Sequence, residues 1–317
     1  MKRMIALVLS LLLLIILLPG CGHSTQPDGK LSVVCTIFPQ YDWVREILSN
    51  KADAFDLALL LQSKADLHNY QPSVDDIVKI SACDLFIYVG GESDGWAEDV
   101  LAQATNKDML SVNLLEVLGD AAKEEELKPG MEAEEEEDGA LDEHVWLSLR
   151  NAELFCASIA DELARLDPDN ADTYQANCAA YTAKLSALDL EYQAVAQAAP
   201  VKVLLFGDRF PFRYLVDDYG LDYHAAFPGC SAETEASFDT IVNLAKKVDE
   251  LGLRSVMVTE SADQSIARTV IENTAAKNQQ ILVLDAIQSV TANDIQNGTT
   301  YLSIMENNLS VLKDTIQ

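Results

Sequence analysis

The sequence predicts an α/β protein of two lobes, each a parallel sheet flanked by helices, joined by one long rigid helix. Short apolar runs typical of buried strands alternate with helical patterns, and such alternation favours parallel sheets. The alternation occurs twice, over residues 31–166 and 200–317, and a helical stretch over 167–199 separates the two halves. The length of 317 residues agrees with about two domains.

The first 30 residues are expected to direct and anchor the chain rather than fold with it. Residues 1–20 begin with two basic residues and continue as a short apolar run, which predicts a secretory signal peptide. Residues 18–21 (LPGC) resemble a bacterial lipobox, which implies cleavage before Cys21 and lipid on that cysteine. The alternative is a plain signal peptide with a chance cysteine. Residues 21–30 are polar and predict a tether, so we expect an extracytoplasmic protein held on the cell membrane as a lipoprotein.

In the first half, four apolar runs predict the strands of one sheet. One helix start carries its own signal, because Ser73 can cap it while Asp75 and Asp76 suit the positive helix end. The expected strands are 31–38, 55–61, 84–89 and 109–114, and the expected helices are 41–48, one beginning at Ser73, 95–104 and 145–166.

The second half repeats the pattern after a long helix. Residues 170–198 are rich in alanine and contain neither Gly nor Pro, and such a helix spans about 40 Å. Its position between two βα halves indicates a backbone that joins the lobes. The expected strands are 201–206, 221–227, 255–259 and 280–284, and residues 299–316 are expected to close the chain as a helix.

Charge excludes one class of partner. The chain has 51 acidic and 22 basic residues, so its net charge of −29 argues against nucleic acid. Twelve of the acids crowd into residues 120–143, where Pro129, Gly130 and Gly139 prevent one continuous helix. Like charges repel, which predicts a solvated surface loop on the first lobe. Its alternative role is a weak collector of cations close to His144.

Two histidines indicate a metal site. His68 and His144 stand at loop-to-helix junctions of the first lobe, on the sheet edge where ligands bind in open α/β sheets. Carboxylates follow strands of the second lobe. Histidine nitrogen combined with carboxylate oxygen suits zinc, manganese or iron.

These histidines also carry a family resemblance. Residues 68–73 (HNYQPS) and 144–147 (HVWL) are similar to two motifs of the zinc/manganese solute-binding proteins of bacterial metal ABC transporters. Residues 35–39 (CTIFP) and 84–88 (DLFIY) look like that family's first and third strands. The resemblance covers essentially everything after Lys30. It implies a carrier, expected to be a monomer, that captures a divalent metal and delivers it to an ABC permease.

The resemblance implies one metal ligand from each of four loops. His68 and His144 match the first two, and Asp285 fits the fourth because it follows a late strand. Two histidines and two aspartates would be intermediate between a zinc and a manganese site. The acidic segment beside His144 favours Zn²⁺ as the cargo, with Mn²⁺ as the alternative.

The third ligand is the point where this chain departs from the family. An ungapped match places Arg209 where His or Glu is normal, and arginine cannot bind a metal. A small insertion would bring Asp208 to that place, directly after the strand 201–206, with Arg209 behind it. The expected ligands are therefore His68, His144, Asp208 and Asp285, and His224 is an alternative to Asp208.

The spacing of the cysteines and the absence of common catalytic motifs limit the other functions that the sequence allows. The six cysteines are widely spaced without a CxxC pair, so they do not predict a metal cluster. Cys35 and Cys83 could pair outside the cytoplasm, and buried free thiols are the alternative for these two as well as for Cys156, Cys178 and Cys230. No GxSxG, P-loop or GxGxxG pattern is present, and no enzyme activity is expected. The rival classes are an exported metallohydrolase using His68 and His144, and an added role as a surface adhesin.

Overall fold

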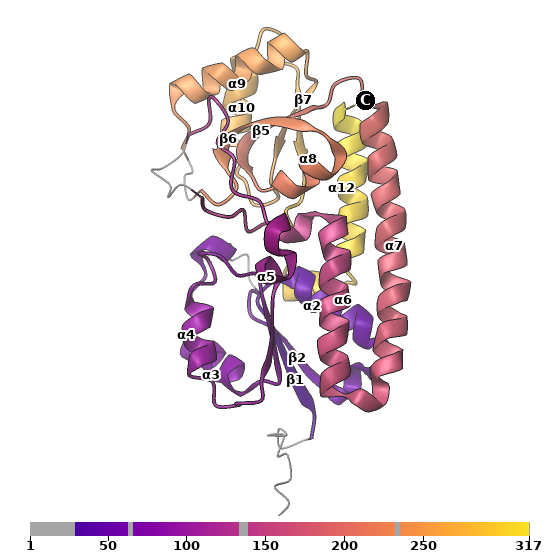
Figure 1. Cartoon of the computed structure of the whole chain (residues 1–317). Helices are drawn as coiled ribbons and strands as arrows, with labels where there is room; N and C mark the ends of the chain where they lie inside the picture. Colours follow the sequence, from indigo (N-terminus) through magenta and orange to yellow (C-terminus); the bar gives the residue numbers. More distant parts are fainter. Residues whose placement is uncertain (1–28, 63–65, 133–138, 232–234, 317) are drawn as a thin grey trace, which may run out of the picture.

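The computed structural model describes residues 29–62, 66–132, 139–231 and 235–316. The predicted fold class is confirmed: two four-stranded parallel sheets, each flanked by helices, form two lobes beside a long helix (Figure 1). All eight predicted strands are present. The predicted signal peptide over 1–20 and the lipidation residue Cys21 lie outside the described residues.

The first sheet has the order β2-β1-β3-β4 with every neighbouring pair parallel. Strand order reverses between β1 and β3, and open α/β sheets bind ligands at such a point, beyond the carboxyl ends of the strands. Its elements are β1 (Leu31–Cys35), α2 (Phe38–Leu48), β2 (Phe55–Leu59), α3 (Val74–Ala82), β3 (Leu85–Tyr88), α4 (Trp96–Ala102), β4 (Leu110–Asn113) and α5 (Leu114–Leu118). The predicted cap of α3 is confirmed, because the Ser73 hydroxyl accepts from the Asp76 N–H.

The second sheet has the same plan, with the order β6-β5-β7-β8. Its order reverses between β5 and β7, so a second binding edge lies at the carboxyl ends of these strands. Its elements are β5 (Val203–Phe210), α8 (Arg213–Tyr219), β6 (Asp222–Pro228), α9 (Phe238–Leu251), β7 (Ser255–Val258), α10 (Ser265–Glu272), β8 (Gln280–Val283) and α11 (Ala292–Gln296).

One strand is longer than the sequence pattern predicts. The expected strand ended at Phe206, but β5 continues to Phe210 through a β-bulge between Phe206 and Arg209. At Gly207 a Cβ atom would lie 2.6 Å from the Ala267 Cα of α10, so only glycine permits this close approach. As a consequence, Asp208 and Arg209 lie within a bulged strand rather than in a loop after it.

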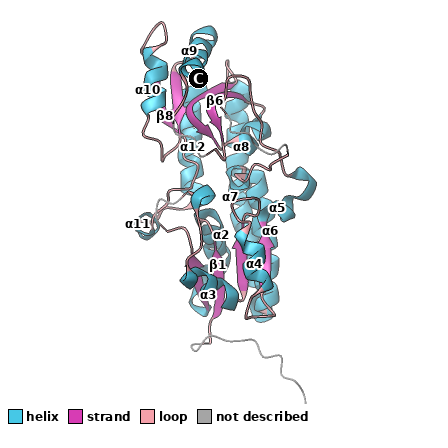
Figure 2. Cartoon of the chain, turned by 90° about the vertical axis from the view of Figure 1, so that its left-hand side faces the viewer, coloured by secondary structure: helices cyan, strands magenta, loops and turns pink. Residues whose placement is uncertain are grey.

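Two helices connect the lobes, α7 (Ala171–Ala198) and α12 (Tyr301–Ile316), while α6 (Leu149–Leu166) packs between α7 and the first lobe. In Figures 1 and 2, α7 runs along both lobes and α12 lies beside it. The Tyr192 hydroxyl of α7 donates to the Met305 carbonyl of α12 at 2.6 Å. The Tyr301 N–H of α12 donates to the Asp42 carboxylate of α2, in the first lobe, at 2.7 Å. The lobes are therefore tied together along a continuous apolar core.

Two further observations concern the membrane and the thiols. None of the described helices has both the length and the apolar character needed to cross a bilayer. Cys35 and Cys83 are both free and buried, so the pairing considered from the sequence is not formed. The Cys83 thiol instead contacts the sulfur of Met109 at 3.5 Å.

Candidate metal centre

The structure brings His68 and His144 into direct contact. His68 lies in the 3₁₀ turn Leu67–Asn69 that follows β2, and His144 caps the 3₁₀ turn Val145–Leu147 that precedes α6. Their Nε2 atoms are 3.1 Å apart. His144 is fully buried, whereas the His68 side chain keeps slight exposure.

A carboxylate stands behind each ring. The His144 Nδ1 atom is 3.1 Å from Asp142 Oδ1, and the His68 Nδ1 atom is 3.4 Å from Glu143 Oε2 and 2.9 Å from the Ser93 hydroxyl. We assign the proton of each ring to Nδ1 from these contacts. Both Nε2 lone pairs then face each other, an arrangement that repels unless a cation lies between them.

The separation of the two rings suits a tetrahedral zinc ion. Bonds of 2.0–2.1 Å from zinc to histidine nitrogen place two ligand nitrogens about 3.3 Å apart. The 3.1 Å between the His68 and His144 Nε2 atoms is close to that value. The two braced imidazoles are therefore spaced as two ligands of one zinc ion would be.

Glu143 is held firmly in its bracing position. Its Oε1 atom accepts from the Ser93 N–H at 2.8 Å. Burial alone would raise the pKa of Glu143, but hydrogen bonds from His68 and Ser93 outweigh it and hold that pKa below the ordinary range. At Gly91 a Cβ would lie 2.4 Å from the Glu143 carboxylate, so glycine makes room for this side chain. The carboxylate therefore stays ionised to orient the His68 ring.

The third side chain at this position is Cys230. The ligand atoms of His68, His144 and Cys230 all lie within 4.8 Å of one another, and in the described parts of the chain these residues form the one such group. Cys230 follows β6 and Gly229, and it is partly buried. Burial, followed by the nearby carboxylates of Asp142, Glu125 and Glu143, raises the pKa of its thiol. Cys230 is not among the ligands that the sequence predicts, because it has no neighbouring cysteine to form a CxxC pair.

Asp208, predicted as the third ligand, is engaged elsewhere. Its Oδ2 atom accepts from the Thr259 N–H at 2.9 Å and from the Thr259 hydroxyl, at the carboxyl end of β7. The structure does not bring it into the group around His68. The physical reason is the bulge of β5, which keeps Asp208 inside the strand and directs it to its neighbour.

Arg209 spans the two lobes instead of lying behind Asp208. Its guanidinium is 2.7 Å from the Asp66 carboxylate of the first lobe and donates to the Ser231 carbonyl at 3.2 Å. Asp66 in turn accepts from the His68 N–H at 3.1 Å. Burial would raise the pKa of Asp66, but the charges of Arg209 and His68 and the hydrogen bonds from both residues together outweigh it and lower that pKa. Arg209 thus helps to fix the turn that carries His68.

Asp285, the predicted fourth ligand, lies in a tight turn after β8. Its Oδ1 atom accepts from the Ile287 N–H at 2.7 Å, and Ile287 has the unusual φ of 61°. Such backbone strain at a β-branched residue is concentrated at functional sites. The Trp146 indole donates to the Ala286 carbonyl at 2.9 Å, which joins this turn to the one that carries His144. The carboxylate is nevertheless outside the three-residue group.

Glu260 supports the same turn from β7. Its two carboxylate oxygens accept from the N–H groups of Ala286 and Gln288 at 2.8 and 3.0 Å. Burial, and then the charge of Glu260, raise the pKa of Asp285 to about 7. Two carboxylates at this edge therefore share a region that disfavours a second negative charge, a condition that a divalent cation relieves.

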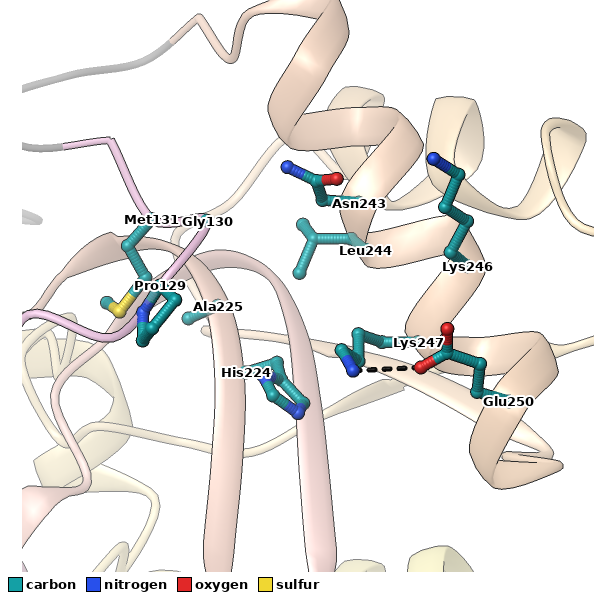
Figure 3. A pocket seen from close by; sticks show the side chains of 10 residues that line it. All are labelled: Pro129, Gly130, Met131, His224, Ala225, Asn243, Leu244, Lys246, Lys247 and Glu250. Atoms are coloured by element: carbon teal, nitrogen blue, oxygen red, sulfur yellow. Dashed lines mark hydrogen bonds and ion pairs between the residues drawn. The ribbon is translucent and has the colours of Figure 1, made fainter.

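His224, the alternative third ligand, belongs to another region. It lies on β6 and lines a pocket with residues of α9 and of the acidic segment, where Lys247 pairs with Glu250 (Figure 3). Burial lowers the pKa of His224. The group around His68 and His144 does not include it.

The acidic segment is attached to the second lobe where the structure describes it. Residues 133–138 lie outside the described part, but both flanks make specific bonds, contrary to a fully solvated loop. The Cys230 N–H donates to Glu125 Oε1 at 2.8 Å, which brings the segment to the histidine group. The other contacts are Lys123 N–H to the Tyr214 hydroxyl, Tyr223 hydroxyl to the Glu126 carbonyl, Glu132 N–H to the Ala226 carbonyl, and the ion pair of Lys128 with Asp222.

Comparison with known proteins places this geometry in context. The chain is 32% identical to the zinc-binding lipoprotein AdcA of Streptococcus pneumoniae serotype 4, over 99% of this chain and 61% of that protein. It is 29% identical to the high-affinity zinc uptake system protein ZnuA of Bacillus subtilis, over 95% of this chain and 94% of that protein. The chain thus spans about three fifths of the length of the AdcA relatives that it matches.

Solved structures agree with these relatives. The Zn(II)-bound ZnuA-like domain of Streptococcus pneumoniae AdcA has a TM-score of 0.72 at 30% identity, covering 91% of this chain and 99% of the domain. The metal-dependent lipoprotein YcdH of Bacillus subtilis has a TM-score of 0.74 at 27% identity, covering 90% and 99%. The model of the family described as zinc-uptake complex component A, periplasmic, matches residues 33–315, and the chain therefore belongs to this family.

Proposed function

We propose that the protein captures one zinc ion between its two lobes and delivers it to an ABC permease. The observation that carries this proposal is the pair of Nε2 atoms of His68 and His144, 3.1 Å apart with a carboxylate behind each ring. Membership of a zinc-uptake family supports the same conclusion. Two imidazole nitrogens suit zinc, whereas manganese prefers oxygen ligands.

In this proposal each lobe supplies part of the site. His68 and His144 come from the first lobe, held by Asp142 and Glu143 so that their Nε2 atoms point at the cargo. The turn of Asp285 comes from the second lobe and offers the predicted fourth ligand. Because both sheets direct their binding edges at the same place, the cation is taken up where the lobes meet.

We further propose that the chain acts outside the cytoplasm as a lipid-anchored monomer. The LPGC sequence over residues 18–21, with Cys21 as the acylated residue, supports this, and the relative AdcA is named a lipoprotein. A binding protein tethered to the membrane stays close to its permease, which raises their effective concentration. The metallohydrolase alternative has no support from the relatives, whose names are those of zinc-binding and zinc-uptake proteins.

Competition against a chromophoric zinc chelator tests the proposal. The purified metal-free chain should bind one zinc ion, and His68→Ala or His144→Ala should weaken binding by about tenfold or more, since even losing a supporting residue costs about 10–100-fold. His224→Ala is the matched control, because His224 lies outside the group. Absence of zinc binding by the unaltered chain, or equal affinity in all three variants, would refute the proposal.

A further inference from the structure

We propose that Cys230 binds the zinc ion through its sulfur and so replaces the third ligand that this chain lacks at Arg209. The inference rests on the proposed function and specifies the chemistry of its site. Zinc would then have two nitrogen ligands from the first lobe and a thiolate from the second. The predicted ligand Asp208 would remain on Thr259, where the structure places it.

The geometry of the three ligand atoms supports this. Zinc–nitrogen bonds of 2.0–2.1 Å and a zinc–sulfur bond near 2.3 Å place sulfur about 3.6 Å from each nitrogen in a tetrahedral shell. The Cys230 sulfur lies within 4.8 Å of one ring nitrogen of each histidine. A small adjustment of the side chains would bring it to bonding distance of an ion held by the two rings.

The backbone around Cys230 is shaped to meet His144. At Gly229 an added Cβ would lie 3.0 Å from His144 Cε1 and 3.1 Å from its Nδ1, so glycine permits the second lobe to reach the ring. The Cys230 N–H is fixed by Glu125 Oε1 at 2.8 Å. The position of the sulfur therefore follows from contacts on both sides of the residue.

Cys230 also differs from the other described cysteines in its surroundings. Cys35, Cys156 and Cys178 pack in the main apolar core, and Cys83 packs in a smaller one. Cys230 belongs to no apolar cluster and is the only partly exposed thiol of the five described. Packing thus explains the other four cysteines but not Cys230.

Binding of zinc by the Cys230 sulfur requires the loss of one proton and affects which metal the site prefers. The thiol proton passes to water as the sulfur–zinc bond forms, and the positive charge of the ion is partly neutralised. A thiolate ligand favours zinc, cadmium and copper(I) over the harder manganese ion. The chain should therefore discriminate against manganese more strongly than a site of two histidines and two aspartates would.

Cobalt substitution of the full metal-free chain tests the assignment. The unaltered protein should show a sulfur-to-cobalt charge-transfer band in the near ultraviolet, and Cys230→Ala should lose that band and bind zinc about tenfold or more weakly. Cys178→Ala should keep both properties. A wild-type cobalt complex without the band, together with unchanged zinc affinity in Cys230→Ala, would overturn the role of Cys230.

A second measurement needs no variant and separates the two proposals. Alkylation of the native metal-free chain, mapped by peptide mass, should label Cys230, and one equivalent of zinc should protect it. If the chain binds zinc in a His68-dependent manner but Cys230 is labelled equally with and without zinc, only the thiolate assignment fails. If the chain binds no zinc at all, the proposed function itself fails.

Discussion

The two lobes contribute to the candidate site in different ways. In the first lobe, His68 and His144 are neighbours with a carboxylate behind each ring, so contacts within that lobe hold this half of the candidate site. In the second lobe, Asp208 is bonded to Thr259, Arg209 reaches across to Asp66, and Cys230 approaches the histidines. In the proposed site, the first lobe would therefore supply a braced pair of histidines, and the second lobe would supply the remaining ligands.

The largest expected effect follows from removing the fixed pair. In the double variant His68→Ala/His144→Ala, two ligands are lost, and tight zinc binding should fall by more than about a hundredfold. Zinc stabilises only a folded chain that binds it, so excess zinc should raise the melting temperature of the unaltered protein and leave that of the double variant unchanged. A zinc-dependent rise in the double variant would mean that the second lobe holds the cation by itself.

Substitutions of the two aspartates of the second lobe, Asp285 and Asp208, should differ clearly in their effect on zinc affinity. Asp285→Asn should weaken zinc binding by about tenfold, because the proposed fourth ligand loses its negative charge. Asp208→Asn should change zinc affinity by less than about threefold and act instead on stability, through its bonds to Thr259. Titration calorimetry and thermal unfolding of both variants measure this. The opposite ranking in affinity would restore Asp208 as a ligand.

The bracing of the first lobe should have a smaller but measurable effect. Glu143→Gln keeps the shape and an acceptor oxygen but loses the charge that orients His68. We expect zinc affinity to fall by about tenfold or less, with the fold intact. Glu116→Gln, on the exposed surface of α5, is the control. Equal zinc affinity in Glu143→Gln and in the control would show that the orientation of the His68 ring does not depend on the Glu143 carboxylate.

The ion pair between the two lobes should have the smallest effect on zinc affinity. Arg209 and Asp66 are both partly exposed, so the coupling energy of a double-mutant cycle should be about 1 kcal/mol or less in the free energy of zinc binding. Arg209→Gln, Asp66→Asn and the combined variant provide the cycle. A coupling several times larger would mean that this pair, rather than the ligands, controls the approach of the lobes.

The same contrast separates what the sequence could predict from what it could not. Each of the eight strands gives a continuous apolar run, and the histidines are set in local motifs, so the fold and the first half of the site follow from short stretches of chain. The bulge at Gly207 is missed because it depends on the contact with Ala267 of α10, more than fifty residues away in sequence. The bond of Asp208 to Thr259, in place of the predicted approach to the histidines, has the same origin.

Cys230 was missed although a signal was present. It follows the predicted strand 221–227 just as Asp285 follows 280–284, and the carboxyl ends of parallel strands meet at one edge. The attachment of the acidic segment was also missed, because repulsion between like charges predicts a solvated loop. The two basic residues of the segment attach it to the second lobe, because Lys123 pairs with Asp217 and Lys128 pairs with Asp222.

X-ray absorption at the zinc edge reports the atoms bound to the metal in the intact protein. For the proposed site we expect two histidine nitrogens at about 2.0–2.1 Å and one sulfur near 2.3 Å. The sulfur shell should disappear in Cys230→Ala, while the imidazole scattering from His68 and His144 remains. A zinc shell of only nitrogen and oxygen in the unaltered protein would contradict closure of the site by Cys230. A shell without imidazole scattering would contradict the site itself.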